Sequence, residues 1–236
     1  MSRTKPVRPT GNHLLDRLPA AEFDRLLADA DIVRFPAKAE LYGIGAIGQP
    51  IYFPIDGVFS LLLPLKEGHQ VEVAVADSEG MLGIPQVLGM ETQPLRAVAQ
   101  VEGACVRVPS ERFLAVLRTA GVLDALVRRF LAVAWQSANQ NIACNLRHTV
   151  RERSCRWLLV VHDRAGADEF DITQEMLAEM VGASRQKVTM VAGALQQAGY
   201  ISYQRGRVRV RDRTGLESVS CECYRVLKKA YEFLTS

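Results

Sequence analysis

Five arginines alternate with small or apolar residues near the end of this 236-residue chain, in the stretch YQRGRVRVRDR. They are Arg205, Arg207, Arg209, Arg211 and Arg213. Side chains two positions apart lie on one face of a β-strand, so this spacing gathers like charges that repel one another. A phosphate backbone beside the strand would relieve that repulsion. The stretch therefore predicts contact with a polyanion, and Arg205 and Arg207 are the best candidates because they lie nearest the expected Arg205-Gly206 turn.

The residues before this strand predict two short helices joined by a tight turn. Thr173 can cap the first helix, and Gly182 can end it in a left-handed conformation. Ser184 can cap the second helix after a three-residue turn. Two short helices joined in this way form a helix-turn-helix unit. The strands on either side of Arg205-Gly206 would then form a β-hairpin wing beside it, while Arg211 and Arg213 could instead pair with Asp212, Glu217 or other acids of the domain surface.

The second helix has an apolar side and a polar side. Val188, Val191, Ala192 and Leu195 follow the spacing of a core-facing stripe. On the other side, Arg185 can form a bidentate pair with guanine and Gln186 with adenine, as side chains of a helix in the DNA major groove do. A solvated helix face is the alternative, but the joint occurrence of caps, turn, stripe and hairpin favours DNA. The predicted DNA-binding residues are Thr173, Ser184, Arg185, Gln186, Lys187, Thr189, Met190, Arg205 and Arg207.

Charge and composition support a polyanion partner at the same end of the chain. The formal net charge is +3, but 15 Lys and Arg face 11 Asp and Glu from Arg147 onward, against 14 and 15 before it. The hydrophobic fraction of 48% predicts a sizeable core. No apolar run approaches the ~20 residues that a membrane span needs, and the start lacks the apolar block of a signal peptide. The chain is therefore expected to be cytoplasmic.

The cysteines and histidines form no recognisable ligand pattern along the sequence. Five scattered cysteines favour reduced thiols over a disulfide framework. The pair Cys221-x-Cys223 is too close for a usual zinc knuckle and has no second pair nearby, so no metal site is expected. An enzyme built on the β-rich segment would need clustered histidine and carboxylate ligands, which that segment lacks. No catalytic residue is therefore predicted.

The amino-terminal half of the chain is predicted to be mainly β-structure flanked by short helices. Residues 20–30 predict a short amphipathic helix. Residues 32–108 alternate short β-rich runs with Gly and Pro, as a small β-barrel or jelly roll does. A helix over SERFLAVL is expected next, with Ser110 as its cap and Gly121 breaking the helical pattern.

A long helix is expected from Val122 to about Thr149, because this stretch contains no Pro or Gly. It carries a seam of small and apolar residues at a spacing of 3.5, which favours pairing with a second copy of the chain over an ordinary core helix. The predicted dimer interface is Leu123, Val127, Phe130, Ala134, Ser137 and Asn141. At the other end of the chain, GLESVSCECYRVLKKAYEFL predicts a terminal helix.

The stretch LAEMVGASRQKVTMVAGALQQAGYISYQRGRVRVRD resembles the Crp/Fnr family of bacterial transcription regulators. It has that family's pattern of Leu-Ala, Gly, Ser-Arg, Val, Leu, Gly-x-Ile and a basic wing, and the resemblance covers nearly the whole chain. It implies an α+β fold with an N-terminal cyclic-nucleotide-binding-like β jelly roll, a long central dimerisation helix and a C-terminal winged helix-turn-helix. The corresponding domains would be a sensor over residues 1–118, a dimerisation helix over 119–149 and a DNA-binding domain over 150–236.

The resemblance also implies a homodimer that binds palindromic promoter DNA and regulates transcription, with RNA polymerase as a candidate partner. A small effector bound to the sensor would re-pose the DNA-binding domains through the long helix. Arg185 matches the family's guanine-reading arginine. Gln186 stands where a glutamate is common and Met190 where a second arginine is common. The DNA half-site is therefore expected to differ from the best-known one.

The sensor departs further from the cyclic-nucleotide-binding members. Ile84 follows Gly83 where those members carry Gly-Glu, and Arg96 falls one place late, which on a strand reverses its face. These departures argue against cAMP. They leave open another small nucleotide-like effector, DNA binding without a ligand, or a redox or haem gas sensor of the same fold, although no cysteine precedes Cys105 to hold an amino-terminal iron–sulfur cluster. The candidate effector-binding residues are Gly83, Ile84, Leu95, Arg96, Ala97, Asn139 and Gln140, of which the last two could instead bond across the dimer seam.

Overall fold

The computed structural model describes residues 4–66, 70–119, 121–165 and 168–235, and the chain divides into two compact units. The first unit runs up to residue 63, resumes from 74 to 135 and includes the chain from 231 onward. The second unit comprises residues 64–73 and 136–230. Among the described helices, none has both the length and the apolar composition that a membrane span requires.

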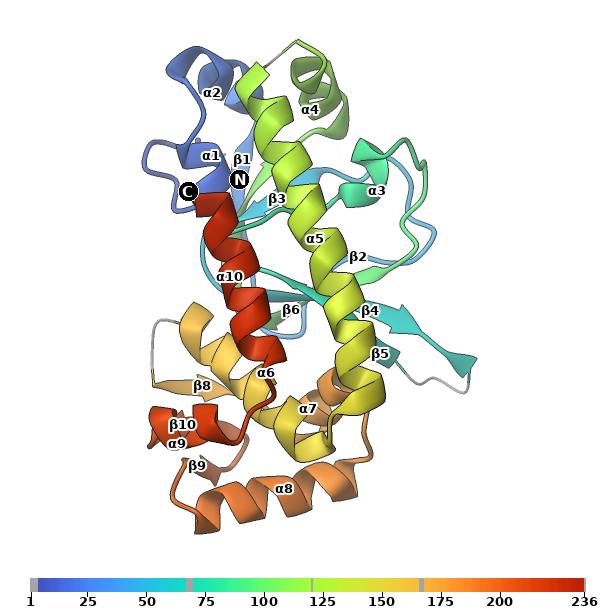
Figure 1. Ribbon diagram of the computed structural model, residues 1–236. Coiled ribbons are helices and arrows are strands. Elements are labelled where there is room, and N and C mark those ends of the chain that lie inside the picture. Colours follow the sequence, from blue (N-terminus) through green and yellow to red (C-terminus); the bar gives the residue numbers. More distant parts are fainter. Residues whose placement is uncertain (1–3, 67–69, 120, 166–167, 236) are drawn as a thin grey trace. The chain divides into compact units, whose positions relative to one another are not determined.

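Antiparallel strands form the predicted β-rich roll (Figure 1). One sheet has the order β1-β7-β3 and the other β2-β6-β4-β5. Phe35 lies edge-on to Tyr52 and Phe59, and Tyr42 stacks on Tyr52, so aromatic rings fill the space between strands. The strands are β1 (Asp31–Phe35), β2 (Glu40–Tyr42), β3 (Ile51–Pro54), β4 (Val58–Pro64), β5 (Gln70–Ala76), β6 (Arg96–Val101) and β7 (Gly103–Val108).

Short helices flank the roll. They are α1 (His13–Asp16), α2 (Ala20–Leu27), α3 (Ile84–Val87) and α4 (Ser110–Leu117). The amphipathic helix expected over residues 20–30 is confirmed as α2, which buries Phe23. The expectation for Ser110 is wrong, because Pro109 occupies the N-cap position of α4, no side chain caps that helix, and Ser110 is its first helical residue.

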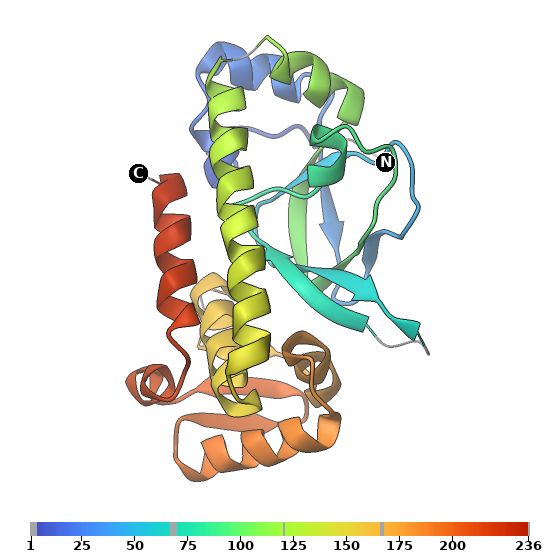
Figure 2. The same ribbon diagram turned by 45° about the vertical axis from the view of Figure 1, so that its right-hand side comes forward.

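The long helix α5 (Gly121–Arg147) runs without a break for 27 residues (Figure 2). Gly121 begins this helix rather than interrupting a longer one. The reason lies in α2, where the Glu22 carboxylate accepts hydrogen bonds from the backbone N–H groups of Val122 and Leu123 at 3.2 and 2.9 Å. A carboxylate there satisfies two of the unpaired donors of the first turn and complements the helix dipole.

The burial of α5 corrects the predicted dimer seam. Leu123, Val127 and Phe130 are only 1%, 2% and 5% exposed within their own chain. Phe130 is packed so closely that a Cβ atom added to Gly80 would lie 2.7 Å from its ring. Asn141 also bonds its own chain, donating to the Val73 carbonyl. This face of α5 is therefore occupied, and Ala134 and Ser137 on it are half-buried.

The exposed apolar side chains of α5 lie on a different face. Trp135, Ile142 and Leu146 are 73%, 60% and 79% exposed. Their spacing of seven and then four residues places them in one stripe along the helix.

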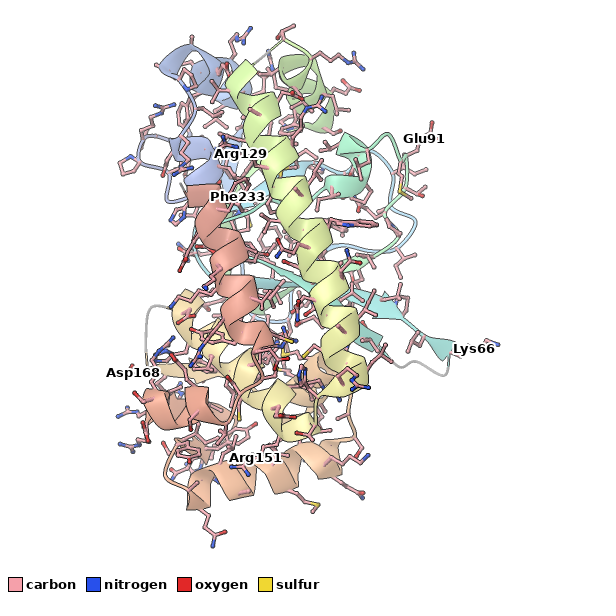
Figure 3. The ribbon with its side chains drawn as sticks, viewed as in Figure 1. Lys66, Glu91, Arg129, Arg151, Asp168 and Phe233 are labelled. Carbon is pink, nitrogen blue, oxygen red and sulfur yellow. The ribbon has the colours of Figure 1, made fainter. Side chains whose placement is uncertain are left out.

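In the first unit, Arg129 of α5 lies 5.7 Å from the ring centre of Phe233, near the end of the chain (Figure 3).

The second unit contains the predicted helix-turn-helix and wing. Thr149 and Glu152 form a capping box at the start of α6 (Val150–Ala165). The Glu152 carboxylate accepts a hydrogen bond from the Thr149 backbone N–H at 2.7 Å, and Thr149 Oγ1 accepts one from the Glu152 N–H. These bonds from Thr149 hold the pKa of Glu152 below its ordinary value. The remaining elements are β8 (Glu169–Asp171), α7 (Gln174–Val181), α8 (Arg185–Gln197), β9 (Ile201–Gln204), β10 (Arg207–Val210), α9 (Arg213–Ser218) and α10 (Cys223–Thr235).

Two helices replace the single terminal helix that the sequence predicted. Asp212 caps α9 by accepting from the Gly215 N–H at 2.9 Å, and α9 ends at Ser218. The backbone then runs without helical structure until α10 begins at Cys223. Strand β8 is a further element that the sequence did not predict, since it is only three residues long and forms by pairing with β10.

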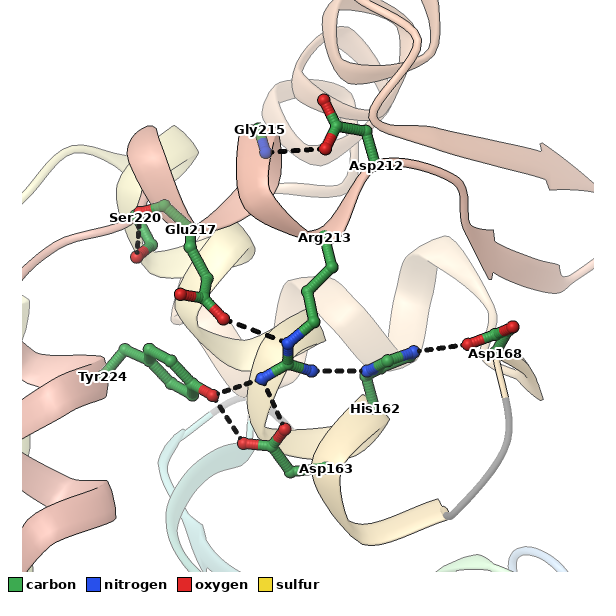
Figure 4. A network of polar contacts seen from close by, with 9 residues as sticks. All are labelled: His162, Asp163, Asp168, Asp212, Arg213, Gly215, Glu217, Ser220 and Tyr224. Atoms are coloured by element: carbon green, nitrogen blue, oxygen red, sulfur yellow. Dashed lines mark hydrogen bonds and ion pairs between the residues drawn. The ribbon is translucent and has the colours of Figure 1, made fainter.

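Arg213 anchors α9 to its surroundings within this unit (Figure 4). Its guanidinium donates to the carboxylates of Glu217 and Asp163 at 3.0 and 2.6 Å, and to the hydroxyl of Tyr224 at 2.6 Å. It also donates to Nδ1 of His162 at 2.6 Å, so this nitrogen is the acceptor, and Nε2–H of the same ring faces Asp168. The predicted pairing of Arg213 with Glu217 is therefore confirmed.

Replacing Arg213 by Leu is expected to lower the free energy of unfolding by about 2 kcal/mol, because it leaves several partners of a charge-assisted network without a donor. The half-exposed position of the side chain keeps the loss from being larger. Urea unfolding followed by circular dichroism measures it. Arg225→Leu removes the same charge from an exposed site on α10 and should leave stability within about 0.5 kcal/mol. Equal losses in the two variants would contradict the anchoring role.

Candidate nucleic-acid interface

The caps predicted for the helix-turn-helix are present. Thr173 Oγ1 accepts from the Met176 N–H at 3.2 Å, and Ser184 Oγ accepts from the Lys187 N–H at 3.4 Å. Gly182 ends α7 in the left-handed region, with φ of 60°. These local bonds fix where α7 stops and α8 starts, and therefore which side chains α8 presents at its amino-terminal end.

The two sides of α8 also follow the sequence pattern. Val188, Ala192 and Leu195 are at most 3% exposed and join the core of the second unit. The opposite side is exposed, and Met190 reaches 75%. The exposed residues at the start of α8 are Arg185, Gln186, Lys187, Thr189 and Met190. Because these side chains are exposed, they can approach base edges.

Arg185 and Thr189 are held in place by the start of α7. The Arg185 guanidinium contacts the Glu175 carboxylate at 2.7 Å, and Thr189 Oγ1 donates to Gln174 Oε1 at 2.6 Å. The Arg185 and Glu175 side chains are 65% and 63% exposed, so this ion pair contributes little stability and Arg185 can exchange it for another acceptor. The sequence argument did not identify Gln174 and Glu175, although their position directly after the Thr173 cap was a usable signal.

The wing is a tight hairpin of β9 and β10. Arg205 and Gly206 both have positive φ, of 50° and 80°, which suits the two-residue turn that matches the twist of the strands. Val208 and Val210 are buried, whereas Arg207 and Arg209 point outward. The predicted alternation of the wing is therefore confirmed.

The repulsion among the wing arginines is relieved inside the unit, which the sequence argument did not foresee. Strand β8 pairs with β10 so that Asp171 lies opposite Arg207 and Glu169 opposite Arg209. Arg207 Nε contacts Asp171 at 2.8 Å, and Arg209 Nε contacts Glu169 at 2.7 Å. The bond from Arg209 is the main reason that the pKa of Glu169 lies below its ordinary value. The outer face of the wing is therefore a ladder of alternating charges.

One recess lies between the wing and α8. It has a volume of about 490 Å³, and Thr173, Arg185, Thr189 and Arg205 all contribute to its lining. A second recess of about 580 Å³ lies on the outer face of the wing, and its lining includes Arg205, Arg207 and the acids of β8. The predicted DNA-binding residues thus lie on adjoining concave surfaces of the second unit, with Ser184, Gln186, Lys187 and Met190 exposed beside them.

The candidate effector residues of the first unit lie at the starts of α3 and β6. Helix α3 begins at Ile84, directly after Gly83, which has φ of 109° and lies against Ile51. Arg96 sits in the regular part of β6 and contacts the Glu40 carboxylate on β2 at 2.5 Å, while Ala97 is buried on the other face of the strand. Leu95, just before β6, is half-buried. Arg96 is therefore paired with Glu40 on the strand face opposite to that of the buried Ala97.

Two of the polar residues late in α5, Gln140 and Asn141, form hydrogen bonds within the second unit. Gln140 Nε2 donates to Cys223 Sγ at 3.0 Å, whereas Asn139 is exposed. Arg156 donates to Asn141 Oδ1 at 3.0 Å. Gln140 thus faces a cluster of cysteines.

Comparisons with known proteins agree with this geometry. The Crp-like helix-turn-helix domain matches residues 152–219, and the cyclic nucleotide-binding domain matches residues 32–120. The cyclic AMP receptor protein of Thermus thermophilus is 23% identical over 210 residues, which cover 89% of this chain and 97% of that protein. Two solved structures share the fold. For FixK2 of Bradyrhizobium japonicum the TM-score is 0.71 and the sequence identity is 16%, and the match covers 81% of this chain and 98% of FixK2. For the c-di-GMP responsive regulator CLP of Xanthomonas campestris the TM-score is 0.65 and the identity is 17%, and the match covers 81% of this chain and 99% of CLP.

Proposed function

Because this chain belongs to the Crp/Fnr family of bacterial transcription regulators, we propose that it binds a palindromic promoter site as a homodimer, with one α8 in each of two successive major grooves. It is a DNA-binding regulator with a cyclic-nucleotide-binding-like sensor, in a family that is not enzymatic. Regulators with this helix-turn-helix bind promoter DNA and act as dimers. The observation that carries the proposal is the recess shared by Arg185 of α8 and Arg205 of the wing.

The roles of the three chain segments follow from this proposal. Residues 1–118 act as the sensor, 119–149 as the dimerisation helix and 150–236 as the DNA-binding domain. The regulator works in the cytoplasm, where its promoter lies, and RNA polymerase is its partner there. Within the DNA-binding domain, Arg185 reads guanine and Gln186 reads adenine, while the wing arginines contact phosphate.

The dimer seam in this proposal is the exposed apolar stripe of α5. Trp135, Ile142 and Leu146 project from a helix face that the described residues of the chain leave exposed. Apolar side chains of this size are rarely left in a row on a monomer's surface, and two such helices would bury them together. This seam replaces the register that begins at Leu123.

We propose that the effector, where one acts, is a small nucleotide-like molecule other than cAMP. Arg96 is already paired with Glu40, and Ile84 offers no carboxylate for a ribose hydroxyl. Ligand-independent DNA binding is the alternative. A thermal-stability screen of cAMP, cGMP and cyclic dinucleotides distinguishes a ligand-regulated protein from one that binds DNA without a ligand. A ligand present at 100 times its Kd stabilises the folded protein by about 2.7 kcal/mol. A rise in Tm with cAMP would contradict the proposal.

Selection of duplexes from a randomised pool tests the function itself. The purified chain should enrich sequences with two inverted half-sites whose centres lie one helical turn apart. Enrichment of a single half-site, or none at low ionic strength with the candidate ligands present, would count against paired recognition helices.

The wing arginines should set part of the salt dependence of DNA binding. Replacing Arg205 and Arg207 together by Ala is expected to reduce the slope of log K against log salt by about two per chain, because each contact releases counterions from one phosphate. Fluorescence anisotropy at a series of salt concentrations measures the slope. The variant Arg225→Ala/Lys229→Ala removes the same charge from exposed positions on α10 and should leave the slope unchanged.

A further inference from the structure

Four metal-ligating side chains meet inside the second unit. Cys144 and His148 stand four residues apart at the end of α5, so they lie on one face of that helical stretch. Cys221 and Cys223 come from the segment between α9 and α10 and from the first residue of α10. The three cysteines are 0%, 3% and 0% exposed and form a small core of their own. The sequence argument that Cys221 and Cys223 have no second pair nearby is thus wrong in three dimensions.

The spacing of the donor atoms is that of a single metal ion. All four ligand atoms lie within 4.8 Å of one another. The Cys144 and Cys221 sulfurs are 3.6 Å apart, and the Cys223 sulfur lies 3.6 Å from Nδ1 of His148. A tetrahedral zinc site with Zn–S of about 2.3 Å and Zn–N of about 2.0 Å requires about 3.8 Å between two sulfurs and about 3.5 Å between sulfur and nitrogen.

The surrounding groups suit bound thiolates and a neutral imidazole. Nε2 of His148 lies 3.2 Å from a Glu222 carboxylate oxygen, which directs its proton outward and leaves Nδ1 facing the sulfurs. Such a carboxylate behind a histidine is the common second partner of a zinc ligand. Gln140 donates to the Cys223 sulfur at 3.0 Å, as a hydrogen-bond donor beside a bound thiolate does.

This cluster differs from an ordinary buried thiol elsewhere in the same unit. Cys155 packs as a small hydrophobe within the apolar core of the unit. Cys144, Cys221 and Cys223 instead form a separate cluster, in which polar contacts join the sulfurs to one another, to His148 and to Gln140. An apolar packing role for the three cysteines does not account for this contrast.

We propose that Cys144, His148, Cys221 and Cys223 bind one Zn²⁺ ion. Three thiolates and one imidazole are soft to borderline ligands that favour zinc over magnesium or calcium. With four protein ligands, the ion has no open position for a substrate and acts structurally. It ties the end of α5 to the start of α10, two segments separated by 77 residues between Cys144 and Cys221. The proposal does not depend on the DNA-binding function.

Metal analysis of the purified full chain under reducing conditions tests the site. We expect one zinc per chain by elemental mass spectrometry, after supplying zinc and removing loose metal with a weak chelator. Replacing zinc by Co²⁺ should give the visible absorption of tetrahedral cobalt together with thiolate-to-cobalt charge transfer. A chain that takes up less than a tenth of an equivalent, or a freshly purified chain with a Cys144–Cys221 disulfide, would overturn the proposal.

Matched variants separate binding from folding. Cys144→Ser/Cys223→Ser should lose the metal, whereas Cys105→Ala, a buried thiol of the first unit, should keep a full equivalent. Full zinc content in the double variant would mean that the metal binds elsewhere and would overturn the proposal. His148→Cys retains four ligands, so it should still bind cobalt, with a stronger charge-transfer band from the added thiolate. An unchanged cobalt spectrum in this variant would remove His148 from the site and contradict the assignment.

Discussion

The Trp135→Glu/Ile142→Glu variant should be a folded monomer at micromolar concentration. The two side chains are the exposed apolar centre of the α5 stripe, and in a symmetric dimer each substitution would place two carboxylates against a buried seam. DNA affinity for a palindromic site should fall by about 100-fold or more, because two linked half-site contacts become one. Sedimentation velocity measures the association, and fluorescence anisotropy measures the affinity.

The control for this prediction lies one position along the helix. Gln136 is exposed but points about a quarter turn away from Trp135, so Gln136→Glu adds a charge outside the stripe. It should remain dimeric. Circular dichroism of the double variant should match that of the parent chain, since neither replaced side chain contributes to the core. A double variant that still sediments as a dimer would return the seam to another face of α5.

Arg185→Ala should weaken binding to the preferred site by about 1–3 kcal/mol, roughly 5- to 150-fold, and relax the preference at one base pair in each half-site. The reason is the loss of a bidentate contact that only guanine can offer. Competition among duplexes that differ at each position measures the preference. Arg185 is exposed, so the fold should not change.

Glu175→Gln serves as the matched control, since it removes the partner of Arg185 and keeps the arginine. Its base preference should be that of the parent chain. Uniform weakening of Arg185→Ala at every sequence would instead assign this arginine to phosphate.

The helix-turn-helix and wing could be predicted from the sequence because their signals are local. Thr173, Gly182 and Ser184 each act within four residues of their own positions, and the buried stripe of α8 has the period of a helix. The α+β architecture of a β-rich roll, a long helix and a winged helix-turn-helix is likewise confirmed.

The proposed dimer face of α5 could not be predicted in the same way. A helix that packs on its own roll along one side and, in the proposed dimer, on a second copy along another carries two apolar stripes. Leu123 and Val127 mark the first, and Ile142 and Leu146 mark the second. A heptad pattern reports that a stripe exists but not what covers it. A tryptophan outside the predicted seam, Trp135, was the available sign in the sequence.

Contacts between distant segments were also beyond the reach of the sequence pattern. Strand β8 becomes a strand through β10, which brings Asp171 and Glu169 to the wing arginines. Cys144 and His148 lie more than seventy residues before Cys221. No spacing rule connects such residues, because their proximity depends on how the helices of the unit pack.

The tip of the wing places an arginine where the backbone favours asparagine or glycine. Arg205 has a left-handed conformation with φ of 50°, which costs a side chain of this kind on the order of 1 kcal/mol. A hairpin tuned for rigidity alone would carry Asn-Gly there. Asparagine at position 205 would relieve this backbone strain and stabilise the turn. Its side chain is shorter than that of arginine, however, so it would extend less far from the tip of the wing.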